Sequence, residues 1–191
     1  MNQFTQDLMM NMEQSSSRTL GCRFPKGGFT LTEVMVVITI IAIITGIAIP
    51  NFLTWLANAR LRDAAQDLVS DFQFAKSEAI RRNKNVVLRP DTKVCVPGIP
   101  SPGGGYAIFA DDGSGGGVAR DNIQNGTEPL LKQINMPQGA AVCANSFATG
   151  YTGYTPNGRP IGLLGGTVTM QNDKGRTRVV TLSIAGGVSL D

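Results

Sequence analysis

The fold of this chain depends on residues 26–50, which read KGGFTLTEVMVVITIIAIITGIAIP. Residues 29–49 are almost wholly apolar, and at 1.5 Å per residue they would form about 31 Å of helix. That length matches the hydrocarbon thickness of a bilayer. A buried core helix is the alternative, but globular helices rarely lack a polar face over about six turns. The segment is therefore predicted to span a membrane.

The charges beside the span predict its orientation. Arg23 and Lys26 precede it closely, and no cation follows until Arg60. The positive-inside rule then keeps the N-terminus in the cytoplasm and sends the C-terminal part across the membrane. The small pair Gly27–Gly28 lies before the apolar run, whereas a conventional secretory signal is cleaved after it. Cleavage after Gly28 would remove residues 1–28, a polar leader, and leave the span attached as an anchor.

One charged residue interrupts the span. An ionised side chain at Glu33 would cost about 2.5–3.5 kcal/mol inside the membrane and needs a partner. Cleavage after Gly28 would create one, the new α-ammonium group of Phe29, one helical turn away. The pair could form within one chain or between neighbouring chains.

Residues 26–33 (KGGFTLTE), the apolar run and Pro50 closely resemble the class III signal of type IV prepilins and type II secretion pseudopilins. The resemblance implies cleavage between Gly28 and Phe29 by the membrane prepilin peptidase, and N-methylation of Phe29. Glu33 matches the family's fifth mature residue, which is implicated in filament assembly. The leader is longer than is common in the family.

An amphipathic helix follows Pro50. Apolar residues recur there at spacings of three and four, on one face of a helix: Ala57, Leu61, Ala65, Leu68, Phe72, Ala75 and Ala79. Charged residues are predicted to lie mostly off this face: Arg60, Arg62, Asp63, Asp67, Asp71, Lys76 and Glu78. The small, Ala-rich face favours packing against a sheet over a coiled-coil seam. Pro50 is expected to kink or locally open the helix rather than end it, so that the helix runs to about Asn83.

From Asn85 the apolar period changes to two, which is typical of strands. The candidate strands are short and are separated by Gly, Pro and Asn: residues 86–88, 93–96, 106–110, 130–136, 167–170, 179–184 and 188–190. They predict an antiparallel sheet or small sandwich laid on the amphipathic helix. This is an α+β fold, the plan that type IV pilins share.

Details of the head resemble the pseudopilin H/FimT group of minor pilins. The similar segments are residues 75–83, 86–88, 105–111, 178–183 and 186–188. The resemblance implies a structural subunit of a type II secretion pseudopilus or a type IV pilus, in its initiation or tip complex. It also implies contacts with other pilins through the N-terminal helix, with prepilin peptidase and with an inner-membrane assembly platform.

The expected organisation has four parts. Residues 1–28 form a cleaved leader, residues 29–53 a transmembrane and filament-core helix, residues 54–83 its amphipathic half, and residues 84–191 a β-rich periplasmic head. The protein would be a single-pass inner-membrane subunit with a cytoplasmic N-terminus until it joins a periplasmic or surface filament.

The chain contains three cysteines. Cys22 lies in the leader, which leaves Cys95 and Cys143 as an even pair in an oxidising compartment. A disulfide between them would close a loop of about 48 residues and stabilise the head by roughly 4 kcal/mol. Two separate buried thiols are the alternative. A zinc site lacks support, because the chain has neither a CxxC spacing nor histidine.

No cofactor, metal site or catalytic constellation is predicted. Residues 111–121 (DDGSGGGVARD) suggest a calcium loop, but Gly fills positions where ligands would be needed, so a flexible loop between strands is favoured. No serine has a candidate base and no phosphate loop is present, so an enzyme is not expected. The net charge of +3 is too small for composition alone to indicate a nucleic-acid-binding protein.

DNA binding is the alternative function. Gly175-Arg176-Thr177-Arg178 resembles the GRxR motif through which some FimT-type pilins bind DNA, and Lys174 lies beside it. These cations could meet phosphates during DNA uptake in natural transformation. The motif falls one strand earlier than the family's terminal Gly-Arg, and that terminal position here reads Gly186-Gly187-Val188-Ser189. A solvated hairpin turn at residues 172–175 explains the same residues without a ligand.

Overall fold

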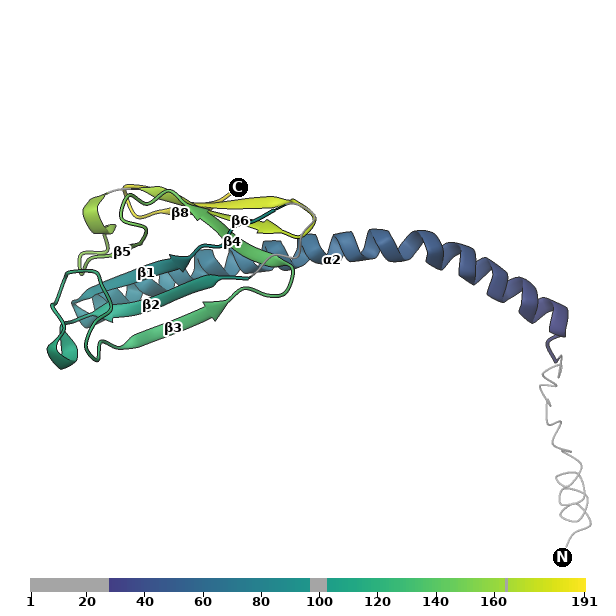
Figure 1. Cartoon of the computed structure of the whole chain (residues 1–191), viewed down its shortest axis with the longest axis horizontal. Helices are drawn as coiled ribbons and strands as arrows, with labels where there is room; N and C mark the ends of the chain where they lie inside the picture. Colours follow the sequence, from purple (N-terminus) through teal and green to yellow (C-terminus); the bar gives the residue numbers. More distant parts are fainter. Residues whose placement is uncertain (1–27, 97–102, 164) are drawn as a thin grey trace, which may run out of the picture. The chain divides into compact units, whose positions relative to one another are not determined.

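The computed structural model describes residues 28–96, 103–163 and 165–191. The chain divides into two units, the residues up to Ile44 and Thr45–Asp191. One long helix, α2 (Leu31–Arg82), has its first part in the first unit and the rest in the second, which also contains every described strand (Figure 1). Apart from Gly28, the predicted leader, including Cys22, lies outside the described residues.

The helix α2 continues through Pro50, as the sequence predicted, and ends at Arg82. Asn83 then adopts the left-handed conformation, with a φ of 54°. The N–H of Lys84 donates to the carbonyl of Ala79 at 3.3 Å, which satisfies one of the last helical carbonyls. This left-handed cap turns the chain from the helix into the first strand.

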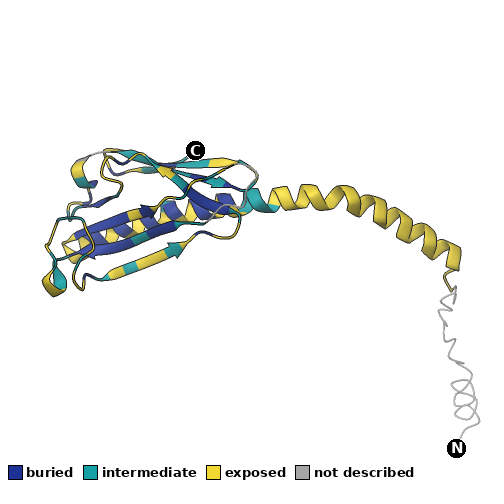
Figure 2. Cartoon of the chain, viewed as in Figure 1, coloured by how far each residue is buried: buried dark blue, intermediate teal, exposed yellow. Residues whose placement is uncertain are grey.

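The amphipathic face predicted for α2 is buried from Leu61 onward, and Ala57 is half-buried (Figure 2). The buried residues of the helix are Leu61, Ala64, Ala65, Leu68, Asp71, Phe72, Ala75, Glu78 and Ala79. The prediction that the charged residues lie mostly off this face was wrong for Asp71 and Glu78. Burial of these carboxylates is compensated by cationic partners, Lys132 of a strand for Asp71 and two arginines of α2 itself for Glu78, described below.

In the part of the chain that the structure describes, eight strands form two antiparallel sheets of four strands each. The first sheet has the order β3-β2-β1-β5 and the second the order β4-β6-β7-β8. The strands are β1 (Asn85–Asp91), β2 (Gly105–Asp111), β3 (Leu130–Asn135), β4 (Ala140–Asn145), β5 (Thr152–Tyr154), β6 (Gly166–Asn172), β7 (Thr177–Leu182) and β8 (Val188–Leu190), with short 3-10 turns η1 (Ser114–Gly116) and η2 (Ile161–Leu163).

Six of the seven predicted strands are present, and the exception is residues 93–96, which form no strand. This segment runs beside β4 through a single backbone hydrogen bond, from the N–H of Lys93 to the carbonyl of Val142 at 2.8 Å. The strands β4 and β5 were not predicted. Their sequences, AAVCAN and TGY, are rich in Ala or contain Gly, residues that are depleted in strands.

The hydrophobic core is one cluster to which α2 and both sheets contribute. Phe72 of the helix, Ile108 of β2, Val142 of β4 and Met170 of β6 are all fully buried in it. Burial of these side chains is what holds the two sheets and the second half of α2 together. The α+β, pilin-like plan expected from the sequence is therefore the observed one.

Candidate functional site

The predicted cleavage site and Glu33 lie at the start of α2. Thr30 immediately precedes the helix; its Oγ1 accepts a hydrogen bond from the N–H of Glu33, and its carbonyl accepts one from Val34, both at 3.2 Å. Thr30 is thus the N-cap, in the Thr-x-x-Glu pattern of a capping box. Cleavage between Gly28 and Phe29 would leave this cap intact.

The apolar part of α2 is not covered by any of the described residues. Every residue from Gly28 to Trp55 is exposed. The most apolar 18-residue window of the helix has a mean hydropathy of 2.4, and none of it is buried. An apolar surface of this extent needs lipid or other protein around it.

Three polar side chains tie α2 to the first sheet. Asp71, only 4% exposed, accepts a hydrogen bond from the Tyr106 hydroxyl of β2 at 2.8 Å and an ion pair from Lys132 Nζ of β3 at 2.6 Å. Burial, reinforced by the Asp71 carboxylate, holds the pKa of Tyr106 far above its usual range, so its hydroxyl stays a donor. The sequence analysis missed this cluster, although Asp71 follows Leu68 by three residues and so lies in the apolar period.

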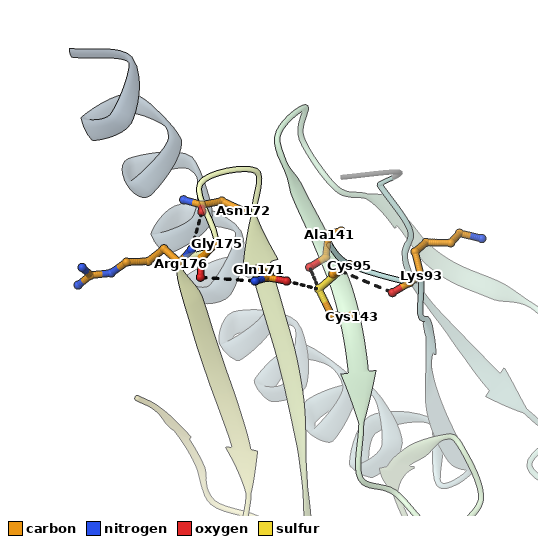
Figure 3. The surroundings of a disulfide bond; sticks show 8 residues. All are labelled: Lys93, Cys95, Ala141, Cys143, Gln171, Asn172, Gly175 and Arg176. Atoms are coloured by element: carbon orange, nitrogen blue, oxygen red, sulfur yellow. Dashed lines mark hydrogen bonds between the residues drawn. A yellow bond between two sulfur atoms is a disulfide. The ribbon is translucent and has the colours of Figure 1, made fainter. Parts of the chain in front are cut away.

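The predicted disulfide is present. Cys95, which follows β1, is bonded to Cys143 of β4, with the two Cα atoms 5.5 Å apart (Figure 3). The pairing of β4 with β6 shifts register between Val142 and Ala144, so Cys143 is the extra residue of a β-bulge. Together with the Lys93–Val142 hydrogen bond, the disulfide joins the end of a first-sheet strand to the edge of the second sheet.

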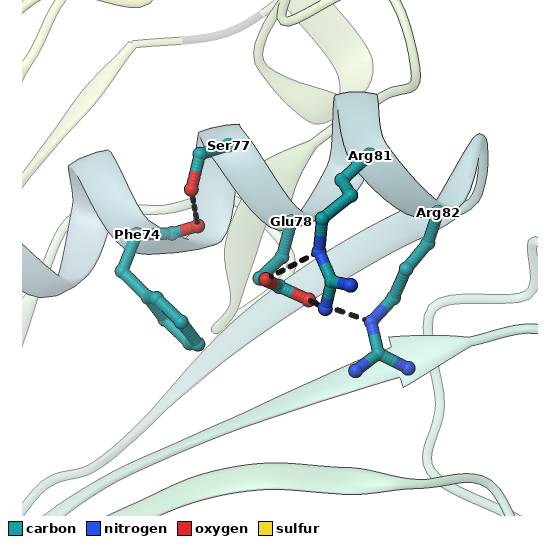
Figure 4. Close-up of polar contacts among 5 residues, drawn as sticks. All are labelled: Phe74, Ser77, Glu78, Arg81 and Arg82. Atoms are coloured by element: carbon teal, nitrogen blue, oxygen red, sulfur yellow. Dashed lines mark hydrogen bonds and ion pairs between the residues drawn. The ribbon is translucent and has the colours of Figure 1, made fainter.

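Near the C-terminal end of α2, a buried carboxylate binds two arginines of the last helical turn. The side chain of Glu78 is 11% exposed and accepts from Arg81 Nε at 2.9 Å, from an Arg81 terminal nitrogen at 2.6 Å and from Arg82 Nε at 2.7 Å (Figure 4). These two arginines, Arg81 first, lower the pKa of Glu78 to about 2. They also place positive charge at the negative end of the helix dipole.

The contacts of Glu78 with Arg81 and Arg82 predict a specific loss of stability in acid. The pKa of Glu78 is lower in the folded chain than its ordinary 4.5, so its contribution is complete above about pH 4.5 and is lost as the pH falls toward about 2. Glu78→Gln should remove this contribution, about 1 kcal/mol after allowance for the largely exposed Arg81. Urea unfolding at pH 7 and pH 3 measures it.

The matched control is Asp63→Asn, at an exposed carboxylate of the same helix that forms no ion pair among the described residues. The difference between wild type and Glu78→Gln should shrink at pH 3, while Asp63→Asn should follow the wild type at both values. An equal Glu78→Gln deficit at both pH values would contradict the assignment.

The carboxylates at the end of β2 and in the loop that follows it accept hydrogen bonds from backbone and side-chain groups of that loop. Asp111, fully buried, accepts from the N–H groups of Arg120 and Asn122. Asp112 accepts from Ser114, and Asp121 from the N–H of Ile123 and the amide of Asn125. Desolvation raises the pKa of Asp111. Within the described residues, no group of three or more potential metal-binding side chains is found.

Residues 64–186 match the model of a protein family described as Type II transport protein GspH, and this region is well over half of the chain. The chain belongs to the GspH family. A second model, described as the prokaryotic N-terminal methylation motif, matches residues 23–49, which include Gly28, Phe29 and Glu33.

A solved structure of a type IV minor pilin shares the fold of this GspH-family chain. This structure, of FimU from Pseudomonas aeruginosa PAO1 in space group P21, is 19% identical and has a TM-score of 0.50. The match covers 70% of this chain and 90% of FimU. FimU in space group P65 gives 0.46 at 19% identity, over 69% and 92% of the two chains. Among curated proteins no match is found.

The GspH match, the methylation motif and the fold agree with the sequence analysis, and the chain is a minor pilin or pseudopilin. The family and fold are those of structural pilin subunits rather than of known enzymes. Membership of the family implies contact with other pilins and processing by prepilin peptidase.

The candidate DNA contacts of this GspH-family chain lie on the hairpin between β6 and β7. Its turn is closed by backbone hydrogen bonds between Asn172 and Arg176 (2.9 Å) and between Gly175 and Asn172 (3.0 Å), and Gly175 supplies the positive φ, 79°. The Arg176 side chain points away from the strands (Figure 3), Lys174 is exposed and Arg178 is half-buried. A solvated hairpin accounts for the exposed Lys174 and Arg176 without a ligand, and DNA binding stays the alternative function.

Proposed function

We propose that this chain is an inner-membrane precursor that is cleaved between Gly28 and Phe29, methylated on Phe29, and then inserted into a pseudopilus or pilus as part of its initiation or tip complex. One observation carries the proposal. The exposed apolar helix has a single carboxylate, Glu33, in its first turn, next to the Gly28–Phe29 junction.

The exposed helix needs an apolar environment at each stage. Before assembly, the bilayer covers residues 29–49, and in the filament the helices of neighbouring subunits replace the lipid. The same apolar surface is thus covered by lipid in the membrane-inserted precursor and by neighbouring helices in the filament.

Glu33 has a defined electrostatic role once the leader has been cleaved. Cleavage leaves the α-ammonium of Phe29 one residue before the N-cap Thr30, at the positive end of the helix dipole, where a cation is unfavourable. A carboxylate in the first turn offsets both the dipole and the ammonium charge. The nearest carboxylate is Glu33, either of the same subunit or of the next one in the filament.

The disulfide supports a periplasmic position for the head. Structural disulfides form and persist in oxidising compartments such as the bacterial periplasm. Cys95–Cys143 lies in the head, C-terminal to the proposed span. The cytoplasmic position of Arg23 and Lys26 given by the positive-inside rule agrees with the same topology.

Glu33→Val is expected to leave the protein inserted and cleaved but to reduce its incorporation into filaments at least severalfold. It removes the carboxylate that offsets the charge of the mature terminus, while valine fits the apolar layer. Cysteine crosslinking to neighbouring pilins in cells measures incorporation; membrane fractionation and intact mass confirm insertion and cleavage.

Glu33→Asp is the control, because it keeps the charge and should retain most crosslinks. Unchanged crosslinking of Glu33→Val would show that this carboxylate has no part in assembly.

A further inference from the structure

Two aromatic rings follow the apolar run of α2 directly. Phe52 and Trp55 lie three residues apart, with ring centroids 5.7 Å from each other and planes tilted by 31°. They are 58% and 62% exposed, so the residues that the structure describes leave most of their surface uncovered. Trp55 is the single tryptophan of the sequence.

The helix changes from apolar to polar at Phe52 and Trp55. Residues 29–49 are apolar, whereas Asn51, Thr54 and Asn58 are polar and Arg60 carries the first cation after the span. The polar side chains nearest the apolar run donate hydrogen bonds to backbone carbonyls of the helix itself. The Asn51 amide donates to the Ile47 carbonyl at 3.3 Å, and the Thr54 hydroxyl donates to the Pro50 carbonyl at 3.1 Å. This turn can therefore lie where water is scarce.

We infer that Phe52 and Trp55 form an aromatic anchor at the outer headgroup boundary of the bilayer and fix the depth of the helix before assembly. The inference rests on the membrane insertion proposed above. Tryptophan prefers the membrane interface because its ring is apolar and its N–H needs a polar partner. The partner of the aromatic anchor is thus lipid, and the anchor extends the lipid-facing surface of the apolar span.

The spacing along the helix fits this depth. Trp55 follows Ile49 by six residues, about 9 Å of rise. Helical side chains point back toward the N-terminus, so the ring of Trp55 covers the preceding turn rather than its own position. That places the indole within the headgroup layer, which is about 5–7 Å thick on each side of the hydrocarbon.

The test uses Trp55 as its own probe. The full chain is reconstituted in vesicles of phosphatidylethanolamine and phosphatidylglycerol whose acyl chains carry bromine either near the carbonyl end or near the bilayer centre. Flotation with the vesicles is measured first. We expect the shallow bromine to quench Trp55 emission severalfold more than the deep one.

The control is Trp55→Phe/Phe74→Trp, which moves the probe 19 residues along α2 to an exposed position within the head (Figure 4). Neither bromine should quench it. Flotation with Trp55 unquenched, or quenched most by the deep bromine, would overturn the aromatic anchor while leaving membrane insertion intact. A failure to float would overturn both the anchor and the proposed membrane insertion.

Discussion

Gly28→Leu is expected to leave the protein entirely as an uncleaved precursor, whose intact mass still includes residues 1–28. A Cβ at position 28 would meet no atom within 4 Å, and Gly28 does not have a positive φ. The substitution therefore leaves the chain's own fold undisturbed, and its effect falls on the peptidase, which would have to accommodate a bulky residue at the junction.

The wild-type chain, purified from membranes of cells with active prepilin peptidase, should have the mass of residues 29–191 plus one methyl group. Gly28→Ala should be partly processed. Gly46→Leu is the matched control, because Gly46 also has no atom within 4 Å of a Cβ, and it should be processed normally. A wild-type protein that keeps its leader would refute the proposed junction.

Removal of the disulfide should have the largest effect on stability. Cys95→Ser/Cys143→Ser is expected to lower the free energy of unfolding of the head by up to about 4 kcal/mol, since the bond closes a loop with a sequence separation of 48 residues. The loss falls where β4 meets the segment after β1, a junction that otherwise has the single Lys93–Val142 backbone bond. Urea unfolding of the full chain in mild detergent measures it.

Reductant provides the control for the double substitution. It should lower the unfolding midpoint of the wild type and leave that of the double variant unchanged. Peptide mapping without reductant should find Cys95 linked to Cys143 in protein taken from the periplasmic face. Free thiols at both positions there would contradict the assignment.

The second half of α2 shows how far periodicity could predict the core. The spacing of Leu61, Leu68 and Phe72 predicted the buried face correctly, because a helix repeats every 3.6 residues wherever it lies. The same rule misplaced Asp71 and Glu78, since it assumes that carboxylates avoid the core. A buried carboxylate is stable when partners satisfy it, and Lys132 lies 61 residues away from Asp71 in sequence.

Some strands, too, could be predicted from their own residues, whereas others depend on distant partners. The strand β1 contains the consecutive residues Val86, Val87 and Leu88 and was predicted, whereas β4 has little β-propensity of its own. The strand β4 forms because it pairs along its length with β6 and is joined to Cys95. Its register, including the bulge at Cys143, depends on β6 and the disulfide, which no local pattern encodes.

What the sequence determined by itself is local: the apolar first part of the helix, its continuation through Pro50 and the amphipathic stripe. Each depends on residues within a few turns of one another, where spacing fixes geometry. Only the tertiary structure decided which strands pair, that Asp71 is buried against Tyr106 and Lys132, and that Glu78, whose two arginines are neighbours on the same helix, is buried. The Asp71 contacts and the burial of Glu78 exist because the chain folds back on α2, and the energy of a buried charge depends on what surrounds it in the folded chain.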